Sequence, residues 1–117
     1  MTNGWLVRLA ALSGAVAVIA GAFGAHGVTG KPAEWLRTGG EYELIHAVAT
    51  IVAVQLGIRW AAALLLGGSV LFAVTLYAMA LGAPSWLGAV TPLGGLGMIL
   101  GWLLLAGKTT SNQERRP

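Results

Sequence analysis

Cysteine is absent from the sequence, and charged residues are scarce. The 117 residues include four acidic and seven basic side chains, a charged share of 9%, where an ordinary soluble domain has about 25%. The absence of cysteine excludes disulfides, thiolate metal ligands and cysteine nucleophiles, and it leaves the compartment open. The scarcity of charge excludes a typical water-facing surface, so we expect the exterior of the protein to face lipid.

A concentrated basic patch is also missing. The formal net charge is +3, but the Lys and Arg residues are few and scattered along the chain. Nucleic-acid binding requires such residues to cluster on one face or along one helix. We therefore expect no nucleic-acid partner, and we interpret the basic residues as determinants of membrane orientation.

Apolar residues, in contrast, make up 56% of the chain and fall into four segments, near residues 5–24, 41–56, 60–81 and 87–106. A helix that crosses a bilayer needs about 20 predominantly apolar residues. The sequence therefore predicts an all-α integral membrane four-helix bundle. We expect one transmembrane domain over residues 1–108, followed by a polar C-terminal tail over residues 109–117.

The first two segments each admit a second interpretation. The first could form a signal peptide, but three more apolar segments follow where a polar mature domain would stand. The second opens with Glu41 and Glu43 and carries His46, so it could be a re-entrant or interfacial helix. We favour a span for both segments. In the second, the polar end can lie at the level of the lipid headgroups.

The connections between the segments predict how the helices are arranged. Residues 57–59 are short enough for an antiparallel hairpin, residues 82–85 form a tight turn, and residues 25–40 form the one long loop. An even number of spans places both termini on one side of the membrane. That side would hold Arg8, Arg59, Lys108, Arg115 and Arg116, and the other side Lys31 and Arg37. Because Lys and Arg are enriched on the cytoplasmic side, we predict both termini in the cytoplasm.

Small residues recur at four-residue spacing along three of the segments. They are Ser13, Ala17, Gly21 and Ala25 in the first, Ala49, Ala53 and Gly57 in the second, and Gly97 and Gly101 in the fourth. Such stripes let helix backbones approach closely in a bilayer. We favour packing within one chain, and a homo-oligomer or a larger membrane complex remains open beside the expected contact with membrane lipids.

A few polar residues near the start of the second segment are candidates for a functional site, because ionisable groups at membrane depth are costly. We expect His26, Glu41, Tyr42, Glu43 and His46 to cluster where the first segment ends and the second begins. Three interpretations compete. The group fastens the long loop, or it binds a ligand or passes protons, or two histidines and a carboxylate hold a metal. The metal is the least favoured, so we expect no metal and no cofactor.

A second feature is the sequence Thr91-Pro92-Leu93-Gly94-Gly95. Proline removes a backbone donor and glycine leaves carbonyl groups accessible, as in the broken helices that bind ligands in transporters. The alternative, which we favour, is an ordinary helix start with Thr91 as its cap. In either case Thr91, Pro92, Gly94 and Gly95 mark a helix break.

The motifs GAFGAH at residues 21–26 and TG-x-EY-x-x-x-H at residues 38–46, with TP-x-GG at residues 91–95, resemble the YgdD-type family of small membrane proteins. The resemblance covers nearly the whole chain. It implies a multi-pass protein of the bacterial inner membrane and places His26, Glu41, Tyr42 and His46 in a shared motif, which does not include Glu43. The family is one of unknown function, so the resemblance implies no reaction.

We therefore expect a multi-pass membrane protein that is not an enzyme and that binds lipids or a partner as a structural or accessory protein. A small oligomeric transporter or proton-coupled carrier that uses the His and Glu residues is the alternative. A membrane-embedded metalloenzyme is a third and weaker hypothesis. No serine lies in a nucleophile motif.

Overall fold

The computed structural model describes residues 4–114, with side chains up to Lys108, and every regular element in that range is helical. Helix α1 spans Gly4–Ala22 and continues into a π-helical turn, η1, at Phe23–Gly27. Helix α2 spans Gly30–Gln55 and α3 spans Arg59–Ala80. A 3-10 turn, η2, at Ser85–Ala89 leads into α4 at Thr91–Glu114. The predicted all-α membrane bundle of four helices is confirmed.

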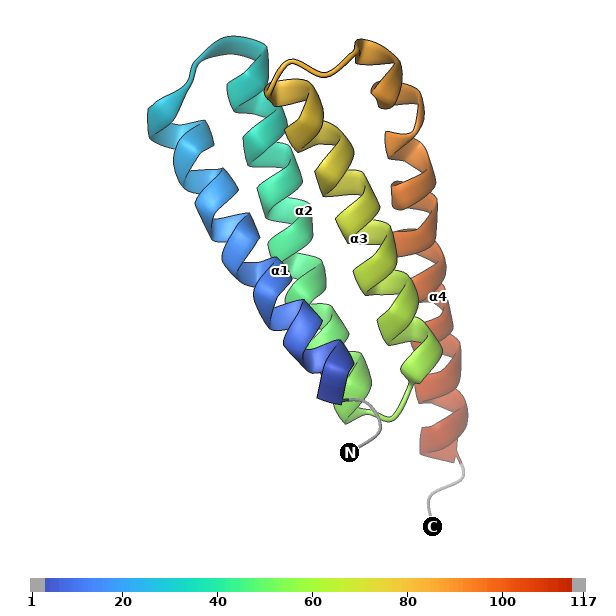
Figure 1. Ribbon diagram of the computed structural model, residues 1–117. Coiled ribbons are helices and arrows are strands. Elements are labelled where there is room, and N and C mark those ends of the chain that lie inside the picture. Colours follow the sequence, from blue (N-terminus) through green and yellow to red (C-terminus); the bar gives the residue numbers. More distant parts are fainter. Residues whose placement is uncertain (1–3, 115–117) are drawn as a thin grey trace.

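The four helices run antiparallel, each beside the next in the sequence (Figure 1). The two ends of the chain and the α2–α3 turn lie at one end of the molecule, and the α1–α2 and α3–α4 connections lie at the other. Helix α1 packs mainly along α2 and α4 packs along α3, while α1 and α3 make far fewer contacts with each other. The bundle is therefore a row of helices with α2 and α3 at its centre.

Within the described residues, three stretches are long and apolar enough to cross a membrane, namely Gly4–Gly27, Arg59–Ala80 and Ser85–Lys108. They contain 24, 22 and 24 residues, and at about 1.5 Å per residue each exceeds the roughly 30 Å hydrocarbon core of a bilayer. Helix α2 is as long, with 26 residues, but it is not among these stretches. Its polar side chains make α2 less apolar than the three stretches, and for the same reason the second segment is the weakest of the predicted spans.

The predicted long loop over residues 25–40 is wrong, since only Val28 and Thr29 lie between η1 and α2. Helix α2 begins at Gly30 and not near residue 41, with Pro32 in its first turn, where proline is tolerated. Gly39 and Gly40, at the end of the predicted loop, are buried in the helix. Packing against neighbouring helices outweighs the weak helix propensity of glycine.

The fourth predicted segment also differs at its boundaries. Helix α4 begins at Thr91, because residues 85–89 form the separate turn η2. The backbone stays helical to Glu114, which includes most of the predicted polar tail over residues 109–117. Residues 115–117, with Arg115 and Arg116, lie outside the described residues.

Helices α3 and α4 approach each other closely through glycine. A Cβ atom added at Gly68 would lie 2.6 Å from the backbone nitrogen of Met98 and 2.7 Å from the carbonyl oxygen of Gly94. On the other helix, a Cβ atom at Gly101 would lie 2.8 Å from the side chain of Leu65. The predicted Gly97/Gly101 stripe therefore packs within the chain, extended by Gly94.

Large apolar side chains cover the exterior of all four helices. Exposed examples include Leu12 and Ile19 on α1, Ile45 and Val48 on α2, Val74 on α3, and Leu96 and Leu103 on α4. In water such a surface would be unfavourable, whereas in lipid tails it is solvated. The bundle is thus built for a bilayer, as the scarcity of charge predicts.

Candidate functional site

Glu43 is a buried acidic side chain at the centre of the bundle, with only 4% of its surface exposed. Ser13 of α1 donates a hydrogen bond to its Oε2 atom at 2.7 Å, and Tyr77 of α3 donates one to its Oε1 atom at 2.6 Å. These lengths are in the range for hydroxyl groups that donate to a carboxylate. One side chain of α2 therefore fastens α1 and α3.

Gly39 allows Tyr77 to reach this carboxylate. It lies one helical turn before Glu43, so the two positions share a face of α2. A Cβ atom at Gly39 would lie 2.7 Å from Cε1 of Tyr77, which means that the tyrosine ring occupies the space of the missing side chain. With the ring packed against α2 at Gly39, its hydroxyl group comes within hydrogen-bond distance of Glu43.

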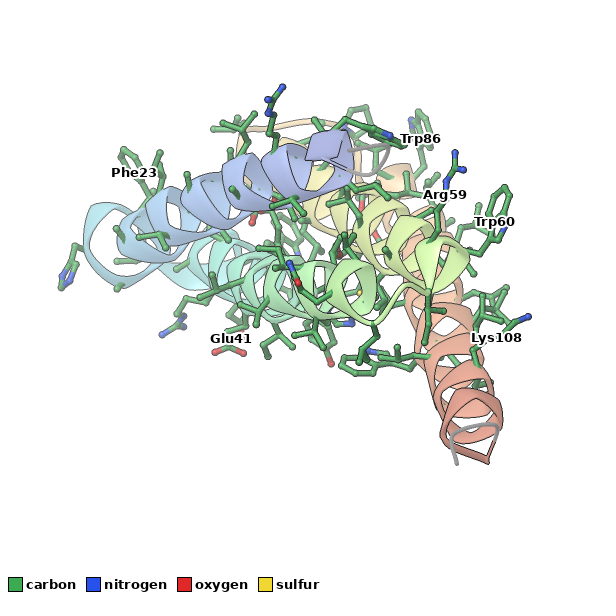
Figure 2. The ribbon with its side chains drawn as sticks, turned by 90° about the horizontal axis from the view of Figure 1, so that it is seen from below. Phe23, Glu41, Arg59, Trp60, Trp86 and Lys108 are labelled. Carbon is green, nitrogen blue, oxygen red and sulfur yellow. The ribbon has the colours of Figure 1, made fainter. Side chains whose placement is uncertain are left out.

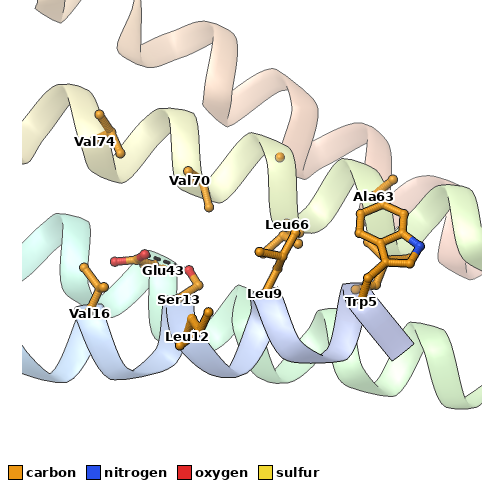
Figure 3. A pocket seen from close by; sticks show the side chains of 12 residues that line it. Trp5, Leu9, Leu12, Ser13, Val16, Glu43, Ala63, Leu66, Val70 and Val74 are labelled. Atoms are coloured by element: carbon orange, nitrogen blue, oxygen red, sulfur yellow. Dashed lines mark hydrogen bonds between the residues drawn. The ribbon is translucent and has the colours of Figure 1, made fainter. Parts of the chain in front are cut away.

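A crevice of about 520 Å³ lies between α1 and α3, above this carboxylate (Figure 3). Its lining residues are Trp5, Leu6, Leu9, Leu12, Ser13 and Val16 of α1, Glu43 of α2, and Ala63, Leu66, Gly67, Val70 and Val74 of α3. Apart from the Trp5 indole, Ser13 and Glu43 supply the polar side-chain groups. The crevice is an aliphatic groove with one acidic group in its floor.

A second, smaller cavity of about 270 Å³ continues between the same two helices. Val16 lines both cavities, and Tyr77 lines the smaller one. The hydrogen-bonded row Ser13–Glu43–Tyr77 therefore bridges the gap between α1 and α3 and separates two apolar spaces.

The row lies deep in the bundle. Ser13 is the tenth residue of the Gly4–Gly27 stretch, which places it about 14 Å along a helix of about 36 Å. If that stretch spans a bilayer, Glu43 lies near the middle of the hydrocarbon layer, far from the headgroups.

His46 forms a second polar connection, between α2 and α4. Its Nδ1 atom lies 2.7 Å from the carbonyl oxygen of Tyr42, and the Nε1–H group of Trp102 donates to its Nε2 atom at 2.9 Å. A carbonyl can only accept and an indole N–H can only donate, so these partners select the neutral imidazole with its proton on Nδ1. The ring of Tyr42 stacks on His46 with centroids 6.1 Å apart.

The structure brings Tyr42 and His46 together but leaves His26 and Glu41 apart from them. His26 is exposed in η1, in a shallow recess with Phe23. Glu41 is exposed on the outside of α2, where it lines a recess with Arg37 (Figure 2). The expected cluster around His26, Glu41 and His46 therefore does not form. Among residues 4–108, no three His, Asp or Glu side chains are placed to hold a metal ion together.

Glu43, which the shared motif omits, takes the central position instead. The signal in the sequence is its register, since Gly39, Glu43, Ala47 and Thr50 follow one another at helical spacing of four, four and three residues. That stripe of small and polar residues is buried along α2, whereas Glu41 is two positions off it.

The Thr91–Gly95 segment serves to pack α4 on α3. The Thr91 hydroxyl lies 2.6 Å from that of Thr75 and donates to the carbonyl oxygen of Leu87 at 3.2 Å, so it fastens the helix start instead of capping it. Pro92 is exposed in the first turn. Gly94 is pressed against the α3 backbone, and Gly95 has open space around it.

Long apolar helices and an apolar exterior define a multi-pass integral membrane protein. Comparison with known families agrees. A family model described as "Protein of unknown function (DUF423)" matches residues 20–95, and the chain belongs to that family.

Bacterial relatives match most of the chain. The UPF0382 membrane protein SERP0230 of Staphylococcus epidermidis is 38% identical over 109 residues, which cover 85% of this chain and 89% of the relative. The UPF0382 membrane protein YwdK of Bacillus subtilis is 38% identical over 111 residues, with 85% and 90% coverage. The UPF0382 inner membrane protein YgdD of Escherichia coli is 36% identical over 116 residues, with 90% and 88% coverage. The resemblance drawn from the motifs is confirmed. No solved structure matches the chain.

Proposed function

We propose that the protein binds a small apolar molecule dissolved in the bilayer, in the crevice between α1 and α3. The observation that carries this proposal is the crevice itself, whose volume of about 520 Å³ lies within the range of about 300–1,000 Å³ typical of ligand pockets. Its aliphatic walls suit an apolar ligand, and Ser13 and Glu43 provide the few polar groups that orient one.

The packing of the helices supports this position for a ligand. Helices in lipid associate where small residues let their backbones approach. A Cβ atom at Gly40 of α2 would lie 3.0 Å from the carbonyl oxygen of Ala17 on α1, and one at Gly68 of α3 would lie 2.6 Å from the backbone nitrogen of Met98 on α4. Between α1 and α3, Gly67 faces the crevice with nothing within 4 Å of its Cβ position. The crevice therefore lies between α1 and α3, the neighbouring pair of helices that do not pack closely against each other.

A binding role explains the structure better than a carrier. The carrier hypothesis rested on a group formed by His26, Glu41 and His46, and on a ligand-coordinating break at Thr91 and Pro92. In the structure the first two residues are exposed and separate from His46, and residues 91–95 form the unbroken start of α4, which packs on α3. We extend the proposal to the location, since one relative is named an inner membrane protein. There the end that carries both termini would face the cytoplasm.

The test of binding is photolabelling of the protein in lipid nanodiscs with a small apolar diazirine. We expect saturable labelling of Leu9, Leu12 and Val70 in the crevice, which an excess of unlabelled probe suppresses. The variant Gly67→Leu should reduce this labelling several-fold by filling the crevice. Gly95→Leu is the matched control, because that glycine also has open space but lies on α4, outside the crevice. Labelling that never saturates, or that Gly67→Leu leaves unchanged, would contradict the proposal.

A further inference from the structure

We infer that the ligand of the crevice is a compact lipophilic amine, whose ammonium group the Glu43 carboxylate binds. This inference rests on the proposed function and names the chemical class of the ligand. It combines three observations: the surroundings of the carboxylate, its depth, and the nature of the crevice walls.

Glu43 is a buried acid without a cation. In the described part of the chain, the ion pair that forms joins Lys31 and Glu34, far along α2 and at the surface. The partners of Glu43 are the neutral hydroxyl groups of Ser13 and Tyr77. Since a carboxylate has about four acceptor positions, two remain for a ligand. A buried charge is stable when it is paired, so a cationic ligand completes the site.

His46 does not compete for this role, although it lies on the same helix. Both of its ring nitrogens are engaged, one by Tyr42 and the other by Trp102. The elements packed around Glu43 therefore present to it one hydroxyl group from α1 and one from α3. The side chains that complete the crevice walls are apolar apart from Trp5.

The depth of Glu43 decides between kinds of amine. A phospholipid keeps its charged headgroup at the surface of the bilayer, roughly 15 Å from the midplane. Ser13 and Glu43 lie about 14 Å along a helix of about 36 Å, too deep for such a headgroup. A compact amine, whose nitrogen is attached directly to an apolar skeleton, can reach this depth. Its skeleton would then pack against the aliphatic walls.

The wall chemistry also disfavours an inorganic cation. Hard cations such as Ca²⁺ take six or more oxygen ligands, and Mg²⁺ takes six. The crevice supplies the Glu43 carboxylate and the Ser13 hydroxyl, with aliphatic groups around them. An ammonium group needs a few acceptors and tolerates apolar contact on its carbon side, so it fits this lining.

The experiment compares two competitors of one skeleton, 1-adamantylamine and 1-adamantanol, for displacement of the apolar diazirine from nanodisc-embedded protein. For the wild-type chain we expect the amine to displace the probe at a concentration at least about tenfold lower than the alcohol, as a charge-assisted hydrogen bond predicts. In Glu43→Gln this preference should disappear, because the side chain keeps its shape and loses its charge. Glu41→Gln, which alters the exposed acid on the same helix, should keep the preference.

The outcomes separate the two claims. If 1-adamantanol displaces the probe equally well from the wild-type chain and from Glu43→Gln, the variant is folded and its crevice is intact. Saturable labelling with equal potency of amine and alcohol would overturn the amine inference and leave the proposed function standing. The amine inference would also be overturned if Glu41→Gln lost the preference for the amine over the alcohol while Glu43→Gln kept it. Absence of saturable crevice labelling in the wild-type chain would overturn both.

Discussion

Gly94 and Gly95 of α4 are neighbours with opposite surroundings. A Cβ atom at Gly94 would lie 2.5 Å from the backbone nitrogen of Phe72 and 2.6 Å from the carbonyl oxygen of Gly68. At Gly95 it would meet nothing within 4 Å. Because backbone atoms cannot rotate away as a flexible side chain can, a methyl group at Gly94 must push α3 and α4 apart.

We therefore predict that Gly94→Ala lowers the free energy of unfolding by about 1–3 kcal/mol, the usual cost of overpacking. Gly95→Ala should leave it unchanged or raise it slightly, since alanine is the better helix former. Unfolding in mixed micelles, followed by circular dichroism, measures both. Equal effects of the two variants would show that α4 does not pack on α3 as described.

The acidic residues show where sequence reasoning succeeds and fails at this scale. Motif membership points to Glu41 as the acid of interest near the start of the second apolar segment, whereas the fold buries Glu43. Helical register distinguishes them, since Glu43 shares the buried stripe of α2 with Gly39 and Glu41 does not. The partners Ser13 and Tyr77 are 30 and 34 residues away, and no local pattern indicates such pairs.

At the scale of the element, apolar length predicts α1 and α3 closely. Helix α3 begins and ends within one residue of the predicted segment 60–81. The start of α2 is missed by eleven residues, because residues 30–40 contain charged side chains, a proline and three glycines, a composition typical of a loop. Their helical state depends on tertiary contacts, with Gly40 against the backbone of α1 and Gly39 under the Tyr77 ring.

The crevice is likewise a property of how the elements are arranged. Helix α1 lies mainly on α2, and α3 lies on α2 and α4, so α1 and α3 diverge above the shared floor (Figures 1 and 3). The small residues Ala63 and Gly67 on the α3 wall widen the gap. None of these positions stands out in the sequence of a chain with 18 glycines, so the crevice could not be predicted from it.

The whole molecule has an asymmetric distribution of basic residues. Arg8, Arg59 and Lys108 belong to the end with both termini and the α2–α3 turn, whereas Lys31 and Arg37 belong to the opposite end. On the positive-inside rule, we propose that the first end faces the cytoplasm.

Because the chain has no cysteine, one introduced thiol reports the orientation without background. We predict that Ser85→Cys, in η2, reacts with a membrane-impermeant maleimide on intact spheroplasts. Gln55→Cys, at the other end of the bundle, should react only after the membrane is permeabilised. Both residues are exposed, so their reactivities are comparable. The reverse pattern would invert the proposed orientation.

The central claim about the whole molecule is that Glu43, in the floor of the crevice, meets the charged group of a ligand. Infrared difference spectroscopy of bilayer-embedded protein tests it most directly, because the chain has only four acidic side chains to contribute carboxyl bands. Addition of 1-adamantylamine should perturb one carboxyl band that is absent from the difference spectrum of Glu43→Gln, and 1-adamantanol should not perturb it. A spectrum that the amine leaves unchanged, or a perturbed band that persists in Glu43→Gln, would contradict the account.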